Sequence, residues 1–444
     1  MRSEPEEIPD EEHEQVLDRV CAVDVAKESG MVCTRLPAAG QRRISRVWQV
    51  PATANAVSDL AGQLVDLGIE KVTVESTSDY WRIWYYLLEA AGLDVQLVNA
   101  RDVKNVPGRP KTDKLDAVWL AKLTEKGMLR PSFVPPRPIR VLRDYTRMRV
   151  DLTRDRTRNW QRLEKLLEDA LIKVTSVASK LQTLSTRDMV EALIAGQRDP
   201  QALAGLARGR LRGKHAALVE ALTGQFDAHH GELARILLDQ IDRLDAQITQ
   251  LTQRIAELVS EIDHAGPPPP DPGSGEQHPP ALDALHRLSE IPGLSTETAQ
   301  LIIAEIGLDM TRFPTAGHLV SWARLCPRTI QSGTKNNAGK AGKGNPYLKG
   351  VLGLAATTAA RSSGSFLAER YRRVVKRRGK GKALVAVARS ILVIIWHLLA
   401  DPTARYHDLG PDYYDQRVNI NRKVNSLVRQ LEALGHTVTL QPTA

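Results

Sequence analysis

The sequence predicts two classes of structure in one chain, an α/β fold in the first third and an all-α arrangement after it. Three observations support this prediction. Strand-like and helix-like segments alternate over residues 19–128, helical periodicity alone runs over 138–264, and a proline-rich break precedes a final, mostly helical part. A chain of 444 residues with 42% hydrophobic content is long enough for roughly two to four domains with separate cores.

The α/β part has the element order of a ribonuclease H-like sheet. Three strands come before the first helix, and strands and helices alternate afterwards. In such a sheet, metal-binding carboxylates collect at strand ends and on a late helix. We expect strands at residues 20–25, 31–36, 43–50, 71–75 and 94–99, and helices at 53–67, 80–91 and 113–127.

Four carboxylates lie where this sheet would hold a metal ion. Asp24 follows an apolar run, Glu75 follows a β-branched stretch, and Asp113 and Asp116 share one face of the expected helix. Hard divalent cations such as Mg²⁺ take oxygen ligands and support phosphoryl transfer. Each residue also has a structural interpretation, since Asp24 could end a strand, Glu75 could be solvated and Asp113 could cap the helix. Their joint placement favours a Mg²⁺ site.

The charge balance predicts a polyanionic partner. The net charge is +9 and the pI is near 9.4, and the excess is concentrated in blocks. Residues 324–349 contain basic side chains and no acid, and residues 361–382 carry nine basic side chains against Glu369 alone.

The cysteines and the N-terminal residues favour a cytoplasmic protein. Cys21, Cys33 and Cys326 form neither a disulfide framework nor a C-x-x-C zinc pair, which indicates a reducing compartment. The acidic leader, residues 1–18, lacks the basic start and apolar middle of a signal peptide.

One late stretch has the length of a membrane span. Residues 383–400 are strongly apolar but include Arg389 and His397, which are costly at the centre of a bilayer. We therefore expect a buried helix there and no membrane partner.

Two stretches with loop character carry basic residues suited to phosphate. Residues 105–112 hold two prolines and a glycine, and residues 326–335 are predicted to form a second loop. Glycines that alternate with lysines follow the second loop and would let the backbone approach phosphate closely. No G-x-x-x-x-G-K-[ST] run is present, so ATP hydrolysis is not expected. The residues expected to contact nucleic acid are Arg109, Lys111, Arg328, Lys335, Lys340, Lys343 and Lys349.

Ser332 lies between Gln331 and Gly333 in the second of these loops. Its hydroxyl could cap a turn or attack a phosphodiester, and local chemistry alone favours the cap.

The middle of the chain is predicted to be helical and to form a coiled coil. Its first part is rich in arginine, which either flanks nucleic acid or forms a solvated face interleaved with acids. Its last part repeats apolar residues at spacings of four and three, an a/d seam that favours a parallel dimer. The competing arrangement is an antiparallel hairpin in which this helix packs on Leu163, Leu166 and Leu167 of the same chain. The seam consists of Leu237, Ile241, Leu244, Ile248, Leu251, Ile255, Leu258 and Ile262.

Residues 291–294, Ile-Pro-Gly-Leu, precede a helical stretch and have the character of a helix-hairpin-helix turn. In that module the turn and the next helix offer backbone N–H groups to phosphate. The same residues also make an ordinary turn between helices.

Several strings in series give the chain a resemblance to the DEDD transposases of insertion sequences, family one-ten, over roughly residues 20–135 and 282–400. Their order and spacing carry the resemblance. The strings are V-D-V-A-K (23–27), V-E-S-T-S-D-Y-W-R (74–82), N-A-R-D-V-K-N-V-P-G-R-P-K-T-D-K-L-D-A (99–117), I-P-G-L-S (291–295), P-R-T-I-Q-S-G-T (327–334) and K-G-N-P-Y-L (343–348).

The resemblance implies a RuvC-like N-terminal domain whose Mg²⁺-binding tetrad is Asp24, Glu75, Asp113 and Asp116, a coiled-coil middle, and a C-terminal transposase domain with Ser332 as nucleophile. Similar proteins are recombinases that join donor and target DNA through a serine-phosphate intermediate. A structured noncoding RNA, the bridge RNA, guides them, so that base pairing reads the sequence.

The resemblance further implies a composite site assembled between protomers of a dimer or a tetramer, and a bacterial, nucleoid-associated protein. One alternative is a Holliday-junction resolvase in which the tetrad activates water and Ser332 is structural. A second is a non-catalytic nucleic-acid scaffold.

The expected domains follow from this interpretation in chain order. They are an acidic leader (1–18), a RuvC-like catalytic domain (19–137), a helical and coiled-coil region (138–264), a proline-rich linker (265–281), a transposase domain (282–400) and a C-terminal tail (401–444).

Overall fold

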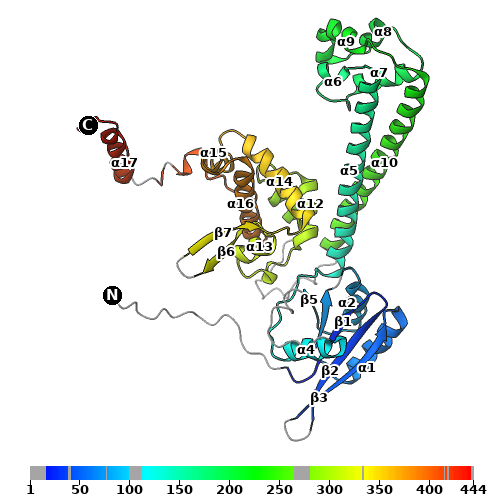
Figure 1. Cartoon of the computed structure of the whole chain (residues 1–444), viewed down its shortest axis with the longest axis vertical. Coiled ribbons are helices and arrows are strands. Elements are labelled where there is room, and N and C mark those ends of the chain that lie inside the picture. The colour runs from blue at the N-terminus through cyan, green and yellow to red at the C-terminus, as the bar shows by residue number, and fades with distance from the viewer. Residues whose placement is uncertain are drawn as a thin grey trace. The chain divides into compact units, whose positions relative to one another are not determined.

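The computed structural model divides the chain into two compact units, Met1–Val134 and Pro135–Ala444 (Figure 1). It describes residues 17–38, 42–76, 78–99, 112–264, 281–332, 335–414, 416–417 and 420–441. Most of the acidic leader and of the proline-rich linker lies outside the described residues.

The first unit is built on a five-stranded mixed sheet in the order β3-β2-β1-β4-β5. β1 pairs antiparallel with β2, and β2 with β3, whereas β1–β4 and β4–β5 are parallel pairs. The elements are β1 (Val20–Val25), β2 (Ser29–Pro37), β3 (Arg43–Pro51), α1 (Ala54–Asp66), β4 (Lys71–Ser76), α2 (Trp81–Ala90), β5 (Val95–Asn99) and α4 (Asp113–Glu125). The strands and helices expected from the sequence are therefore confirmed within a few residues.

Alternation of side chains along β1 and β4 gives the sheet two covered faces. Cys21, Val23 and Val25 point into the larger core, which α1 and α2 cover. Ala22 points the other way, into a smaller core with Ala117 and other residues of α4. Both sets are buried because the sheet is sandwiched between helices, as the short apolar strands predict.

The second unit contains a long helical hairpin, which we call the arm, formed by α5 (Arg137–Asp169) and α10 (Ala228–His264) (Figure 1). Small helices form a head at the end where the two arm helices are joined. The head contains α6 (Val174–Val177), α7 (Leu184–Ile194), α8 (Pro200–Gly205), the 3₁₀ helix η1 (Gly209–Lys214) and α9 (His215–Leu222).

The predicted seam of the arm is a helix as expected, and its partner in the structure is α5 of the same chain. Leu163 and Leu167 pack in one core with Leu238 and Ile241, which is the antiparallel hairpin weighed as the competing arrangement. The middle of the seam, for example Leu244, is only half-buried by α5. Pairing of this seam with a second copy stays a prediction.

The remainder of the second unit is mostly helical. It contains α11 (Ala281–Ser289), α12 (Thr296–Ile306), η2 (Met310–Arg312), α13 (Ala316–Trp322), β6 (Pro327–Ser332), β7 (Lys335–Ala341), α14 (Pro346–Arg361), α15 (Phe366–Arg378), α16 (Lys380–Ala400), η3 (Pro411–Tyr414) and α17 (Ile420–Ala433).

The loop predicted for residues 326–335 is wrong, because β6 and β7 form a two-stranded antiparallel sheet there. Register pairs run from Pro327 with Ala341 to Ser332 with Lys335. Thr329 and Ile330 favour an extended backbone, and pairing satisfies the N–H and C=O groups that a loop would leave to water. The glycine and lysine content of β7 concealed this strand from sequence reasoning.

The apolar stretch near residue 390 forms α16, the one described helix with the length and composition of a membrane span. It packs against α13, α14 and α15. Val387, Ile391 and Ile395 are completely buried there. This packing supports the buried helix expected from the sequence, because core helices of globular proteins share the composition of spans.

The Ile-Pro-Gly-Leu turn joins α11 to α12, and its glycine has a packing role. Gly293 has a φ of 92°, and a Cβ on it would lie 2.4 Å from the carbonyl oxygen of Ala355 in α14. The turn thus lies directly on the backbone of α14. The contact with α14 is sufficient to explain the glycine. It therefore favours an ordinary turn between helices over a phosphate-binding turn.

Replacing this glycine should therefore destabilise the second unit. We expect Gly293→Ala to lower the free energy of unfolding by about 1–3 kcal/mol, because the new methyl group meets backbone and the φ is unfavourable. Urea denaturation measures the change. Gly353→Ala is the matched control, since a Cβ at Gly353 of α14 meets nothing within 4 Å; equal effects of the two substitutions would contradict this account.

Candidate active site

Asp24 and Glu75 lie at the ends of neighbouring parallel strands. The register pair Val23–Val74 immediately precedes them, so the two carboxylates are side by side. Alternation places both on the face that α4 covers, because Ala22 and Thr73, two residues earlier, contact α4. Glu75 is buried, with 5% of its surface exposed, and Asp24 is half-buried. A buried carboxylate at this position requires a cation or hydrogen-bond donors, since burial of an isolated charge is costly.

Asp113 and Asp116 lie in the first turn of α4. They extend the stripe of the helix that continues through Ala117 and Leu120 into the small core. Asp116 is half-buried and Asp113 is exposed. Thr112 is the N-cap, accepting a hydrogen bond from the N–H of Leu115 at 3.3 Å, so the capping role considered for Asp113 belongs to its neighbour.

The far end of α4 is fastened to the sheet, which fixes where its first turn lies. The Thr124 hydroxyl donates to Thr73 Oγ1 at 2.7 Å, and Glu125 forms an ion pair with Arg35 of β2. With that end fixed, Asp116 lies on the same face of the sheet as Asp24 and Glu75. The structure therefore brings three of the four predicted carboxylates onto one face, with Asp113 at its exposed margin.

This set of donors consists of carboxylate oxygens, the ligands that Mg²⁺ and Mn²⁺ prefer. The nearby thiols do not compete for the role of nucleophile or ligand. Burial raises the pKa of Cys33 to about 11 and raises that of Cys21 as well, so both remain protonated near neutral pH.

A second group of possible ligands, in the head, has different chemistry. Asp227, His229 and His230 bring one ligand atom each within 4.8 Å of one another. His230 Nδ1 accepts a hydrogen bond from the N–H of Asp227 at 3.1 Å, and Nε2 faces Asp169 at 3.4 Å. A neutral imidazole that accepts at Nδ1 carries its proton on Nε2 and has no lone pair left for a metal. The three residues therefore fit a hydrogen-bonded N-terminus of α10 better than a metal site.

The predicted nucleophile and basic residues belong to the second unit, at the β6–β7 hairpin. Ser332 ends β6 and pairs with Lys335. The side chains of Ser332, Arg328, Lys335 and Lys340 are outside the described part of the chain, as are residues Arg109 and Lys111 altogether. Lys343 is exposed and available to an anion.

Lys349 and the glycines after the hairpin have structural partners. Lys349 Nζ donates to the carbonyl oxygen of Gly342 at 2.8 Å. Gly344 has a φ of 61°, and a Cβ on it would lie 2.7 Å from the carbonyl oxygen of Ala323. We expected these glycines to let the backbone approach phosphate closely. At Gly344, however, the closely packed neighbour is the backbone of Ala323 in the same chain.

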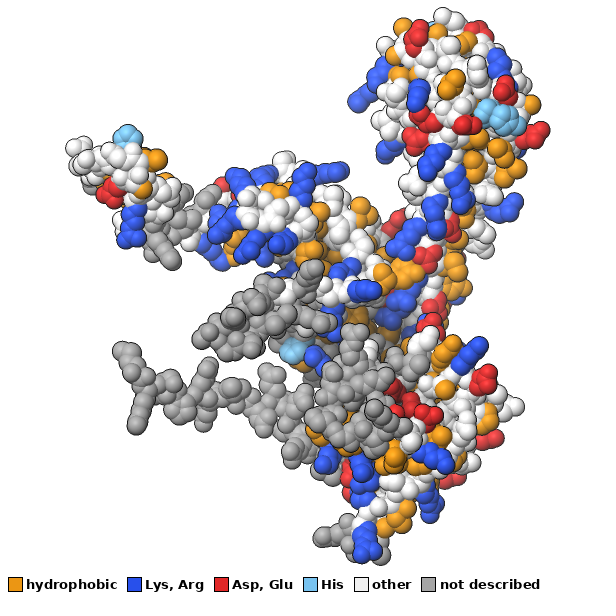
Figure 2. Space-filling model, in the orientation of Figure 1, with side chains coloured by type: hydrophobic (Ala, Val, Ile, Leu, Met, Phe, Trp, Pro, Cys, Tyr) orange, Lys and Arg blue, Asp and Glu red, His pale blue; other side chains and the backbone are white. Residues whose placement is uncertain are grey.

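Basic side chains of the second unit also gather over α15, as Figure 2 shows. Its last turn carries Lys376, Arg377 and Arg378, all exposed or half-exposed. Arginine at the C-terminal end of a helix is favoured by the helix dipole, so part of this charge has a structural reason.

Sequence reasoning missed a buried carboxylate that links the arm to the chain that follows the β6–β7 hairpin. Glu305 of α12 is completely buried. It accepts two hydrogen bonds from Arg147 of α5, at 2.7 and 2.8 Å, and one from Asn345 Nδ2 at 2.5 Å. The hydrogen bonds to Glu305 outweigh the effect of burial and raise the pKa of Arg147. Nothing in the sequence around Glu305 distinguishes it from a surface acid of a helix.

The Asn-Pro-Tyr string gains its explanation from this contact. Asn345 caps α14, its Oδ1 accepting from the N–H groups of Tyr347 and Leu348 at 2.9 and 3.2 Å. The Tyr347 hydroxyl donates to Asp151 of α5 at 2.7 Å, and the Arg147 guanidinium lies over its ring. The residues that follow the hairpin are thereby held on the arm.

Two groups of arginines in the arginine-rich part of α5 differ in their partners. Arg143, Arg147 and Arg149 contact α12, with Arg143 donating to the carbonyl oxygens of Ala304 and Glu305. Further along, Arg154 and Arg158 pair with acids one turn earlier on the helix. The first group is structural, and only the second resembles the solvated face weighed for this segment.

Loss of the buried carboxylate should weaken the second unit. We expect Glu305→Gln to cost about 3 kcal/mol of unfolding free energy, since it removes one partner of a buried ion pair. Urea denaturation of Glu305→Gln, Arg147→Met and the double variant measures the coupling between the two side chains. Effects that simply add would show that the pair does not act as a unit.

Comparisons with known proteins cover both candidate regions. Residues 21–172 match a family model described as Transposase, and residues 285–372 match one described as Transposase IS116/IS110/IS902 family. A Streptomyces clavuligerus protein named Insertion element IS116 uncharacterized 44.8 kDa protein is 27% identical over 338 residues, 71% of this chain and 78% of that protein. A Streptomyces coelicolor protein named Insertion element IS110 uncharacterized 43.6 kDa protein is 32% identical over 117 residues, 26% of this chain and 29% of that protein.

Proposed function

Because this chain belongs to the IS116/IS110/IS902 family of transposases, we propose that it catalyses Mg²⁺-dependent cleavage and exchange of DNA strands. The observation that carries the proposal is the placement of Asp24 and Glu75 at adjacent parallel strand ends under α4. Asp116 and Asp113 complete the proposed tetrad from the first turn of α4.

The fold of the first unit agrees with a RuvC-like assignment. Three antiparallel strands followed by two parallel ones, with a late helix over the acidic face, is the arrangement expected of ribonuclease H-like nucleases. In this assignment residues 19–137 are the catalytic domain and residues 282–400 the transposase domain, joined through the helical region.

The carboxylates fit a divalent cation with oxygen ligands. Glu75 is buried beside Asp24, so their mutual repulsion and the loss of hydration both favour a bound cation. When bound, Mg²⁺ would neutralise charge on the phosphate that reacts. The proposed ligands come from the strands β1 and β4 and from the helix α4. Regular secondary structure would therefore hold the carboxylate oxygens in place.

Ser332 is the proposed nucleophile. Its hydroxyl oxygen forms a bond to a DNA phosphorus, the phosphorus–oxygen bond to the leaving DNA strand breaks, and the hydroxyl proton ends on the released strand. Attack by a second DNA hydroxyl on the serine-phosphate linkage restores the serine. The number of phosphodiester bonds is unchanged, so exchange of strands needs no ATP, in keeping with the missing P-loop motif.

The proposed partners are donor DNA, target DNA and a bridge RNA. The net charge of +9 and the basic residues of the hairpin region suit phosphate contacts, which position a nucleic acid without reading its bases. Reading of sequence would then fall to base pairing with the RNA. A bacterial, nucleoid-associated protein in the cytoplasm fits these partners.

We propose that the active particle is a dimer or a tetramer. The middle of the predicted seam, with Ile248 and Leu251 only half-buried, leaves apolar surface for a second copy. In such an assembly Ser332 of one protomer would meet the carboxylates of another.

Denaturing gels can trap the covalent intermediate. With labelled element DNA, the wild-type protein should give a DNA–protein adduct that Ser332→Ala abolishes, because no hydroxyl remains to attack phosphorus. Ser321→Ala of α13 is the matched control and should keep the adduct. Strand exchange by Ser332→Ala together with loss of activity in Asp24→Ala would instead support the resolvase-type mechanism, in which metal-activated water cleaves.

Metal removal provides a second test. EDTA should abolish cleavage and Mg²⁺ or Mn²⁺ should restore it, because the proposed ligands are carboxylate oxygens. Asp24→Asn and Glu75→Gln should each lower the cleavage rate by at least about 100-fold while DNA binding persists. Cleavage that is indifferent to EDTA would contradict the metal site, whereas DNA binding without any cleavage, with or without the metal, would favour the non-catalytic scaffold.

A further inference from the structure

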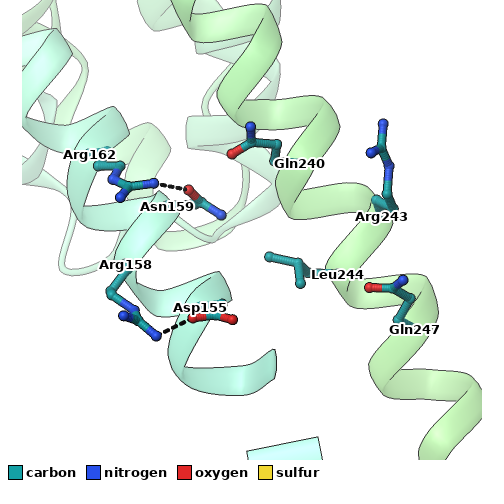
Figure 3. Close-up of a pocket in the computed structure, with 8 residues that line it drawn as sticks. All are labelled: Asp155, Arg158, Asn159, Arg162, Gln240, Arg243, Leu244 and Gln247. Carbon is teal, nitrogen blue, oxygen red and sulfur yellow. Dashed lines mark hydrogen bonds and ion pairs between the residues drawn. The ribbon is translucent and has the colours of Figure 1, made fainter. Parts of the chain in front are cut away.

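A groove of about 390 Å³ lies between the two helices of the arm. Figure 3 shows that its residues come from facing stretches of α5 and α10, with Leu244 pointing toward α5 and Arg243 on the outer side of α10. On each helix the spacing is i, i+3, i+4, i+7, which is one helical face. We call this the arm groove; α5 contributes Asp155, Arg158, Asn159 and Arg162, and α10 contributes Gln240, Arg243, Leu244 and Gln247.

The arm groove interrupts the apolar packing of the hairpin. Toward the head, Leu163 and Leu167 pack with Leu238 and Ile241. Toward the other end of α10, Ile255 and Leu258 are buried again. Between these two regions Leu244, Ile248 and Leu251 of α10 are only half-buried, and Leu244 is the one apolar side chain among the residues that line the groove. A stretch intended only to hold two helices together would carry apolar residues at these positions.

Two arginines of the arm groove have charge that no carboxylate of the described chain neutralises. Arg162 donates to the amide oxygen of Asn159 at 3.1 Å, and Arg243 is exposed. Within the described residues neither arginine forms an ion pair with an acid. Arg158 differs, since it is paired with Asp155.

Other arginines of the arm and the head contrast with these two. Four of them form ion pairs with acids: Arg156–Asp245, Arg187–Asp242, Arg235–Glu191 and Arg254–Glu257. In the head, Arg198 and Arg212 donate to backbone carbonyl oxygens instead.

We propose that the arm groove binds the phosphodiester backbone of the nucleic acid on which this transposase acts, through Arg162 and Arg243. This inference rests on the proposed function, because it assigns one contact of the same substrate. One guanidinium group can donate two parallel hydrogen bonds to the oxygens of one phosphate. The amide groups of Gln240 and Gln247 can add hydrogen bonds to phosphate and sugar oxygens. An acidic helix of a partner protein fits less well, since it would need an apolar strip and the groove provides Leu244 alone.

Salt dependence of binding tests the assignment. Full-length protein is titrated against a fluorescent DNA duplex and an RNA duplex of equal length, in EDTA, over a series of KCl concentrations, with anisotropy as the signal. For Arg162→Gln/Arg243→Gln we expect the log–log slope of the binding constant against salt to fall by about 1.8, or about 0.9 for each phosphate that an arginine no longer neutralises. A fall with DNA alone, RNA alone or both supports the groove and identifies the nucleic acid that occupies it.

Two further variants make the test decisive. Lys180→Gln/Arg210→Gln removes the same charge from exposed side chains of the head and should leave the slope unchanged. Arg162→Lys/Arg243→Lys should restore most of the slope, because charge is retained. A slope equal to that of the control with both duplexes, in protein with an unchanged melting temperature, would overturn the proposal. The proposed function fails separately, through loss of EDTA sensitivity or of the covalent adduct, neither of which enters this binding assay.

Discussion

The parallel pairing of β1 with β4 is the constraint on which the proposed chemistry depends. It places Asp24 and Glu75 at adjacent strand ends, and alternation directs both to the face covered by α4. A shift of one residue in either strand would turn its carboxylate into the opposite, apolar core, so packing of Val23 and Val74 protects the register. The apolar packing that fixes the register therefore holds Asp24 and Glu75 close together, even though the two carboxylates repel each other.

A second buried carboxylate performs a mechanical role in the other unit. Glu305 connects the arm, through Arg147, to the residue that follows the β6–β7 hairpin, Asn345. The chain that follows the β6–β7 hairpin is therefore held by the Asn345 cap of α14 and by the hydrogen bond from Lys349 to the carbonyl oxygen of Gly342. This support would suit the nucleophile proposed at Ser332, since positioning contributes much of a rate enhancement. The arm groove lies on the same arm, further toward the head.

The sequence was informative where the signal is local. Strand and helix order and the buried character of α16 follow from periodicity and turn residues, and the structure agrees with them. The acidic positions of the first unit also follow from the expected strand ends and helix start, and their role as metal ligands stays a prediction. It was uninformative where partners are distant. The strand β7 has the composition of a loop. Gly344 and Gly293 are required because each lies against backbone atoms more than twenty residues away in the chain. Glu305 has a structural role only because an arginine of another helix binds it. For the seam of α10, periodicity predicts an apolar partner but not whether that partner is α5 or a second copy.

The most direct measurement of the central claim replaces Mg²⁺ with Fe²⁺ and maps hydroxyl-radical cleavage of the polypeptide, because the radicals cut backbone close to the bound ion. The account predicts cuts near Asp24, Glu75 and Asp116 in the free protein, and additional cuts in the β6–β7 hairpin once DNA and RNA are bound. Asp24→Asn should remove all of them. Cleavage elsewhere in the chain, or a pattern that Asp24→Asn leaves intact, would contradict a metal site formed by these carboxylates.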